Sequence, residues 1–158
     1  MKNLALFGIG LSIASLLMLP CVARGNTHTG IDKTVSCNYG QKNPMVSGEA
    51  KLSLKNKTIQ RIWFNSYFPG GMGQLGFVCH IDIKRGDKAY AWQDNDLGLT
   101  VTAMETGDIL QLNRDKKGYW LDFALFKTLS KYCGAGADLP LDVFIPLSGK
   151  PCKIRLPQ

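Results

Sequence analysis

Histidine and the common catalytic motifs are scarce in this sequence. Two histidines occur among 158 residues, and only His80 lies in the predicted folded region. There is no Cys-x-x-Cys pair and no Gly-x-Ser-x-Gly elbow, so the usual zinc spacing and the usual serine-hydrolase motif are missing. Nucleophilic catalysis needs a base beside the nucleophile. The sequence therefore favours a protein that is not an enzyme, and it implies neither a metal nor a cofactor.

A long apolar run is also missing after the first residues. Leu4–Leu19 is apolar and follows the positive charge of Lys2, but it is shorter than the about 20 residues that span a bilayer. This pattern predicts a secretory signal peptide over residues 1–25 and no transmembrane anchor. Cys21 raises the alternative of a lipoprotein, although Pro20 stands where the lipid-modifying machinery requires a small residue. We expect an exported protein, in the periplasm of a bacterium or outside the cell.

Dense clusters of one charge are absent, although the formal net charge is +7. The basic residues are scattered, and Lys55–Lys57, Lys84–Arg85 and Lys116–Lys117 are each interpreted as solvated turn residues. The sequence therefore predicts no binding to nucleic acid. Its mild positive charge is compatible with an anionic partner, such as the cell wall, lipopolysaccharide or an acidic protein.

Four cysteines remain after the predicted cleavage: Cys37, Cys79, Cys133 and Cys152. An even number in an exported chain predicts two disulfides. We favour Cys37–Cys79 with Cys133–Cys152, because each bridge then joins neighbouring segments. Cys37–Cys152 with Cys79–Cys133 is the alternative. Each bridge is expected to contribute about 2–4 kcal/mol to the free energy of unfolding.

The rest of the chain reads as a flexible leader over residues 26–33 and one disulfide-stapled β domain over residues 34–158. Apolar and polar residues alternate in about eight short segments with turn residues between them. Ala50, Leu52 and Leu54, for example, alternate with lysine and serine. The predicted fold class is mainly β, an antiparallel β-sandwich or partly closed barrel.

One helix is expected near residues 122–133. Asp122 can cap it, Gly134 can end it, and four apolar residues recur at three-residue spacing, namely Phe123, Phe126, Leu129 and Tyr132. Residues 120–126 could also continue as a strand. The three tryptophans lie in apolar segments, and we expect most of them in the core. If Tyr90 or Trp92 instead faced outward beside the glycine-rich loop, it would offer a platform for a sugar or a protein.

A glycine-rich stretch lies before Phe77. Gly71–Gly76 matches the letters of a dinucleotide-binding fingerprint, but that site requires a helix after the glycines. Here the alternating run Phe77–Ile83 indicates a strand, so we predict a hairpin loop that contacts a partner. The predicted binding residues are Tyr67, Phe68, Gly70, Gly71, Met72, Gly73, Gln74 and His80.

Acidic residues suggest two further sites. Asp94, Asp96 and Glu105 have the spacing of calcium ligands, but Leu99 stands where the loop requires glycine, so turn formation is the better interpretation. A small secreted hydrolase would need His80 or a pair of carboxylates about 5–9 Å apart. The candidates for such a pair are Asp82, Asp87 and Asp122.

A signal peptide, two predicted disulfides, a mainly β chain and an exposed loop occur together here. In this combination the chain from Cys37 to Leu156 resembles small periplasmic lysozyme inhibitors and toxin-immunity proteins. Ser47-Gly48-Glu49-Ala50-Lys51 departs at its last residue from the Ser-Gly-x-x-Tyr motif of one such family. The resemblance implies a protein partner, a cell-wall-degrading enzyme or toxin, blocked by an inserted loop. The alternative is an envelope- or carbohydrate-binding module that uses outward aromatic residues.

Overall fold

The computed structural model describes residues 30–40, 46–69, 76–128, 131–134 and 139–156, which form ten strands in two antiparallel sheets. Sheet A contains, in spatial order, β1 (Lys33–Tyr39), β2 (Ser47–Lys55), β3 (Thr58–Phe68) and β4 (Phe77–Lys84). Sheet B has the spatial order β10-β9-β8-β7-β6-β5. Its strands are β5 (Tyr90–Asn95), β6 (Gly98–Ala103), β7 (Ile109–Arg114), β8 (Gly118–Leu125), β9 (Asp142–Pro146) and β10 (Lys153–Arg155).

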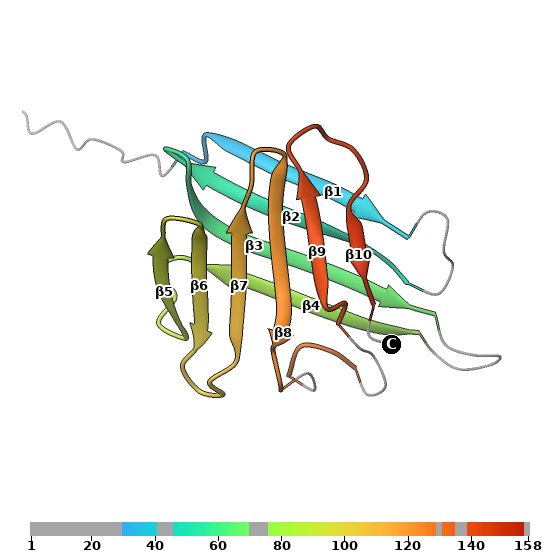
Figure 1. Cartoon of the computed structure of the whole chain (residues 1–158). Coiled ribbons are helices and arrows are strands. Elements are labelled where there is room, and N and C mark those ends of the chain that lie inside the picture. Colours follow the sequence, from blue (N-terminus) through green and yellow to red (C-terminus); the bar gives the residue numbers. More distant parts are fainter. Residues whose placement is uncertain (1–29, 41–45, 70–75, 129–130, 135–138, 157–158) are drawn as a thin grey trace, which may run out of the picture.

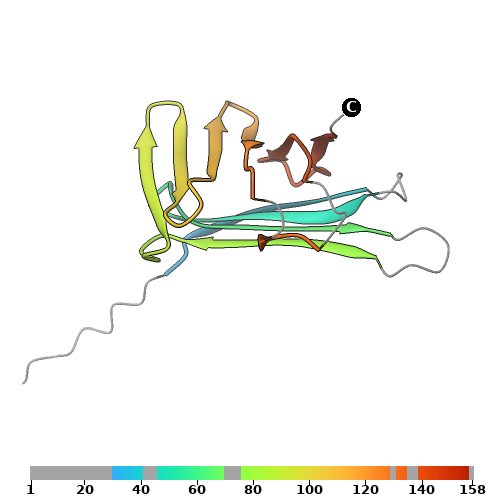
Figure 2. The ribbon, with the colours of Figure 1, turned by 90° about the horizontal axis from the view of Figure 1, so that it is seen from below.

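The two sheets pack face to face, and the strands of one cross those of the other steeply (Figure 1). Seen from below, sheet A forms one layer and sheet B lies on one side of it (Figure 2). The prediction of a mainly β, antiparallel fold is confirmed, and the two facing sheets give it the form of a sandwich. The described strands form no closed barrel, and there are ten of them where about eight were expected.

The core between the sheets follows from the period-2 alternation of the strands. Ile62 and Phe64 of β3 are fully buried, while Trp63 between them faces away from the core. The Phe64 ring lies 4.9 Å from the ring of Phe123 on β8, which joins the two layers. In β9 all five residues are buried, so its outer face is covered as well.

The turn between β2 and β3 places two side-chain-bearing residues in the left-handed region, Asn56 at φ 49° and Lys57 at φ 66°. Lys55 pairs with Thr58 across this turn, so the connection is a two-residue hairpin turn. Positive φ at both central residues is the mark of a type I′ turn, whose backbone twist matches that of the flanking strands. The turn predicted at Lys55–Lys57 is confirmed.

Replacing Lys57 by glycine is expected to raise the free energy of unfolding by about 0.5–1 kcal/mol, because glycine adopts positive φ without a steric penalty. Urea unfolding followed by tryptophan fluorescence measures the change. Lys55→Gly is the matched control: it removes the same side chain within β2, and it should lower stability. A destabilised Lys57→Gly protein would contradict this interpretation of the turn.

The glycine-rich stretch joins β3 to β4 as predicted. Phe68 pairs with Phe77, and the two strands run antiparallel from there to Arg61 and Lys84. A strand thus follows Gly76 where a dinucleotide site requires a helix. Residues 70–75 lie outside the described part of the chain.

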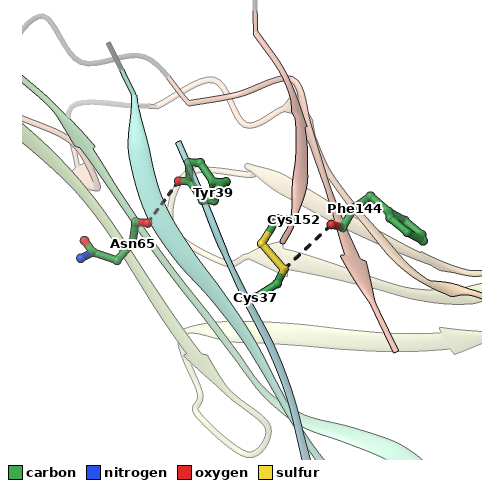
Figure 3. Close-up of a disulfide and its surroundings, with 5 residues drawn as sticks. All are labelled: Cys37, Tyr39, Asn65, Phe144 and Cys152. Atoms are coloured by element: carbon green, nitrogen blue, oxygen red, sulfur yellow. Dashed lines mark hydrogen bonds between the residues drawn. A yellow bond between two sulfur atoms is a disulfide. The ribbon is translucent and has the colours of Figure 1, made fainter. Parts of the chain in front are cut away.

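Two disulfides are present, and they use the alternative connectivity. Figure 3 shows the bridge between Cys37 and Cys152. Cys37 of β1 is bonded to Cys152, which precedes β10, and Cys79 of β4 is bonded to Cys133. The favoured pairing of Cys37 with Cys79 is wrong for a geometric reason. β1 and β4 are opposite edges of sheet A, three strand spacings or about 14 Å apart. A disulfide requires Cα atoms within about 7 Å.

The helix expected near residues 122–133 is not found in the described residues. Asp122–Leu125 is the end of β8, residues 126–128 are irregular, and residues 131–134 form a turn with an isolated bridge from Cys133 to Cys79. The strand forms because Gly118–Asp122 pairs with β9, and because Leu121 and Phe123 alternate into the core. This ladder and burial outweigh the three-residue spacing of the apolar side chains.

No stretch of the described residues forms a helix long and apolar enough to cross a bilayer. The two disulfides are compatible with an oxidising compartment. The predicted signal peptide, residues 1–25, lies outside the described part of the chain.

Candidate functional site

Sheet A has an outer face, on the side away from sheet B (Figure 2), and exposed aromatic residues lie on it. We call this surface the Trp63 patch: Trp63 and Tyr67 of β3 with Val78 and His80 of β4. Alternate residues of a strand face the same side, so two residues from each strand reach this face. Tyr67 pairs with Val78 across the two strands, and His80 pairs with Asn65, which lies between the two aromatic residues on β3. The patch therefore forms one continuous surface.

Trp63 is the centre of this surface and is half-buried among its neighbours. The ammonium nitrogen of Lys51, on β2, lies 4.7 Å from the centre of its ring. The His80 ring lies 5.8 Å away at an interplanar angle of 76°, an edge-to-face arrangement. Such contacts hold an aromatic ring in one orientation. The indole is thus positioned before any partner arrives.

Tyr67 and Val78 extend the patch toward the β3–β4 connection. Their exposed fractions are 45% and 47%, high for large apolar side chains. Tyr67 lies directly against Gly76, where an added Cβ would be 2.5 Å from its hydroxyl oxygen. Gly76 therefore lets the ring lie close to the backbone. These two side chains connect the patch to the predicted contact loop.

Charged pairs border the patch on β2, β3 and β4. The Arg61 guanidinium donates two hydrogen bonds to the Asp82 carboxylate, at 2.6 and 2.7 Å, and lowers the pKa of that carboxyl. Lys51 pairs with Glu49 at 2.8 Å. This arrangement of an aromatic centre and a polar rim is typical of protein interfaces.

The backbone beneath the patch is fixed from the core side. The Tyr39 hydroxyl donates a hydrogen bond of 3.1 Å to the carbonyl oxygen of Asn65, reaching from β1 to β3 (Figure 3). Gly48 of β2 lies between them, and a Cβ there would be 2.4 Å from the Tyr39 oxygen. Burial raises the pKa of Tyr39, so the hydroxyl keeps its proton at neutral pH. The β3 backbone next to Trp63 is therefore well supported.

The predicted binding residues are placed in three ways. Tyr67 and His80 are exposed on the Trp63 patch, and Phe68 is half-buried against the core. The remaining predicted residues, Gly70, Gly71, Met72, Gly73 and Gln74, lie outside the described part of the chain. Trp63 was not predicted as a site residue, because its apolar neighbours suggested the core. The alternation of buried Ile62 and Phe64 would have placed it outside.

The carboxylates considered for hydrolysis each have a local contact. Asp82 binds Arg61, the Asp87 carboxylate accepts a hydrogen bond from the Ala89 N–H, and the Asp122 carboxylate accepts one from the Ala124 N–H. Asp82 lies on sheet A and Asp122 on sheet B.

The residues with calcium-ligand spacing are also engaged in local contacts. Asp94 receives two hydrogen bonds from Arg85, at 2.7 and 2.9 Å, and Glu105 pairs with Lys131. Within the described ranges, no three histidine, cysteine or acidic residues are grouped as metal ligands.

Tyr90 and Trp92 belong to β5, the edge of sheet B, and are half-buried against the core. The Arg85 guanidinium lies over the Trp92 ring, so Trp92 is near the end of β4 opposite Phe77. Of the three tryptophans, all of which lie in the described strands, Trp63 on sheet A and Trp120 on sheet B face outward. No protein-family model, curated protein or solved structure matches the chain.

Proposed function

We propose that the chain is an exported binding protein that docks on a protein partner through the Trp63 patch and the adjoining β3–β4 loop. The observation that carries this proposal is the surface itself: a tryptophan held between Lys51 and His80, with exposed Tyr67 and Val78 beside it. Tryptophan and tyrosine are the residues most enriched in interface hot spots. Docking removes the apolar area of such an exposed cluster from water, which is favourable. Large exposed apolar patches of this kind are typical of protein–protein interfaces.

The resemblance to periplasmic inhibitors and immunity proteins suggests the class of partner. A cell-wall-degrading enzyme or toxin would receive the β3–β4 loop in its cleft, while the Trp63 patch would contact the surface beside it. The Cys79–Cys133 bridge supports this geometry, because it attaches β4 two residues beyond the start of that strand. A loop on a fixed base loses less conformational freedom on binding.

A carbohydrate-binding module is less well supported. Stacking on a sugar ring requires a free aromatic face, and the Lys51 ammonium group lies over the ring of Trp63. A pyranose would have to displace the Lys51 ammonium group, and the cation–π contact between Lys51 and the indole would be lost. Purified peptidoglycan that retains the protein in a sedimentation assay would favour this second function.

Replacing Trp63 by alanine is expected to weaken partner binding by about 30-fold or more, because a central tryptophan in an interface is worth about 2 kcal/mol or more. The wild-type protein is first used to isolate its partner from a periplasmic extract, and the purified pair is then titrated by calorimetry. Trp120→Ala is the matched control, since it removes the same side chain from sheet B. Equal affinities of the wild type and Trp63→Ala would overturn the proposed surface.

A further inference from the structure

A second surface lies on sheet B, where the β7–β8 hairpin meets the loop between β9 and β10. A hollow of about 470 Å³ opens there. The N–H of Leu147 donates a hydrogen bond of 2.9 Å to the carbonyl oxygen of Lys117, and Gly118 pairs with Pro146, so the two loops are joined. The hollow, which we call the lysine groove, is lined by Lys116, Lys117, Phe144, Pro146, Leu147, Ser148, Lys150, Pro151 and Lys153.

The floor of the lysine groove is apolar. Phe144 is only 9% exposed, and its ring packs 4.8 Å from the ring of Trp120 on β8. A Cβ on Gly118 would be 2.8 Å from the Phe144 ring, so this glycine provides the space for it. Leu147 remains 38% exposed at the rim, and Trp120, outside the lining of the groove, is equally exposed. The floor of the groove is therefore apolar, with one exposed leucine at its rim and an exposed tryptophan packed against Phe144.

The rim of the groove is cationic and has no acidic member. Among the described residues, none of its four lysines takes part in a salt bridge. Two acidic residues lie on the strands and turns around the groove: the Asp115 carboxylate accepts hydrogen bonds from the N–H groups of Lys117 and Gly118, and Asp142 pairs with Arg155. The groove therefore has an excess of positive charge around an apolar floor, which is complementary to an anionic amphiphile.

We propose that the lysine groove binds the surface of a membrane that contains anionic phospholipid. Lysines are compact charges on long apolar stems, which reach a diffuse layer of headgroups without fixed geometry. Tryptophan and an exposed leucine are the side chains that enter the interfacial region of a bilayer. A specific carboxylate or phosphate on a folded partner would more commonly be held by the two-pronged donors of arginine.

Binding at the lysine groove leaves the Trp63 patch free. Phe144 alternates with the fully buried Val143 and Ile145, and Trp63 alternates with the fully buried Ile62 and Phe64, so each faces away from the core. Because the two sheets lie one over the other (Figure 2), the groove and the patch are on opposite sides of the sandwich. A protein attached to the membrane by the groove would present the patch to a soluble partner. Because the two surfaces share no residue, loss of either activity leaves the other intact.

Vesicle sedimentation tests this proposal on the purified protein at about 150 mM salt, where charges farther apart than about 8 Å are screened. Wild-type protein should sediment with phosphatidylcholine vesicles that contain phosphatidylglycerol, and not with phosphatidylcholine alone. The combined variant Lys116→Gln, Lys117→Gln, Lys150→Gln and Lys153→Gln should lower the partition coefficient about 600-fold, since each of the four lysines near such a surface contributes about fivefold. Leu147→Ser should lower it about tenfold.

The matched control removes four lysines that do not line the groove: Lys84 at the end of β4, Lys88 before β5, and Lys127 and Lys131 after β8. Their replacement by glutamine changes the net charge equally and should leave sedimentation within about threefold of the wild type. An equal loss in both quadruple variants would overturn the groove as the site. The membrane assignment would be overturned if vesicles failed to bind while an acidic, leucine-containing peptide bound with the same lysine dependence.

Discussion

Replacing Cys37 and Cys152 together by alanine is expected to lower the free energy of unfolding by about 5 kcal/mol. The bridge closes a loop of 115 residues, and closing a loop of about 100 residues restricts the unfolded chain by about 4.7 kcal/mol. Both cysteines are buried, and they join β1 of sheet A to the residue before β10 of sheet B. A domain of this size has a total stability of about 5–15 kcal/mol, so the variant should be close to unfolded.

Urea unfolding of the oxidised proteins, followed by tryptophan fluorescence, measures this loss. Removing Cys79 and Cys133 is the matched comparison, with a loop of 54 residues. This second substitution should lower the free energy of unfolding by about 4 kcal/mol, nearly as much as the first. The entropy cost of closing a loop grows only with the logarithm of its length. A loss below about 1 kcal/mol for Cys37→Ala with Cys152→Ala would show that the unfolded chain is not restricted in this way.

The disulfide connectivity could not be derived from the sequence because it depends on strand order. Cys37 and Cys79 lie in neighbouring parts of the chain, and both belong to sheet A. The order β1-β2-β3-β4 nevertheless places them on opposite edges. Cys152 instead reaches β1, where its N–H donates to the carbonyl oxygen of Asn38. The partner of each cysteine depends on how the two sheets pack against each other. The alternation of apolar and polar residues within one strand contains no information about that packing.

Strands and hairpins, by contrast, were predictable from local patterns. Alternation placed Ala50, Leu52 and Leu54 on one face, and all three are buried. The same alternation places Trp63 outside, yet its apolar character suggested the core. The strand pattern was the better guide, because every second side chain of a strand must face away from the sheet it packs on.

The lysine groove was not predictable at all. Lys116 and Lys117 were interpreted as solvated turn residues, and nothing linked them to Lys150 or Lys153. The pairing of β8 with β9, and of β9 with β10, brings the two loops together. The lysines of the two loops are more than 30 positions apart in the chain, and their proximity depends on the complete sheet, so periodicity within one segment does not reveal it.

Asp108, in the turn between β6 and β7, carries the second large predicted effect. It is only 2% exposed, and its carboxylate accepts hydrogen bonds from the N–H groups of Lys127 and Thr128, at 2.7 and 2.9 Å. The Thr106 hydroxyl donates a third, at 2.7 Å. These bonds attach the segment that leads from β8 toward Cys133 to the turn between β6 and β7. Asp108→Ala leaves all three donors without their acceptor and should lower the free energy of unfolding by about 3–4 kcal/mol.

Asp108→Asn keeps the shape and one acceptor oxygen, so we expect a smaller loss of about 1–2 kcal/mol at neutral pH. Urea unfolding at neutral pH measures both substitutions. A loss from Asp108→Ala no larger than that from Asp108→Asn would contradict the role assigned to the three donors.

The stability of the wild type relative to Asp108→Asn should depend on pH in a defined direction. Burial by itself would raise the pKa of Asp108, but the hydrogen bonds from Thr106, Lys127 and Thr128 outweigh it and hold that pKa below its ordinary value of about 3.9. The contribution of the carboxylate is therefore complete above the ordinary pKa and is lost as the pH falls through the lowered one.

Urea unfolding of both proteins between about pH 2 and pH 7 tests this dependence. The difference in free energy of unfolding should stay constant above about pH 5 and shrink below about pH 4. The pKa values of Asp82 and Asp115 are lowered too, by hydrogen bonds from Arg61 and from the Lys117 N–H. Both proteins contain these groups, so the difference isolates Asp108. Curves that remain parallel down to about pH 2 would mean that the Asp108 carboxylate does not stabilise the fold by its charge.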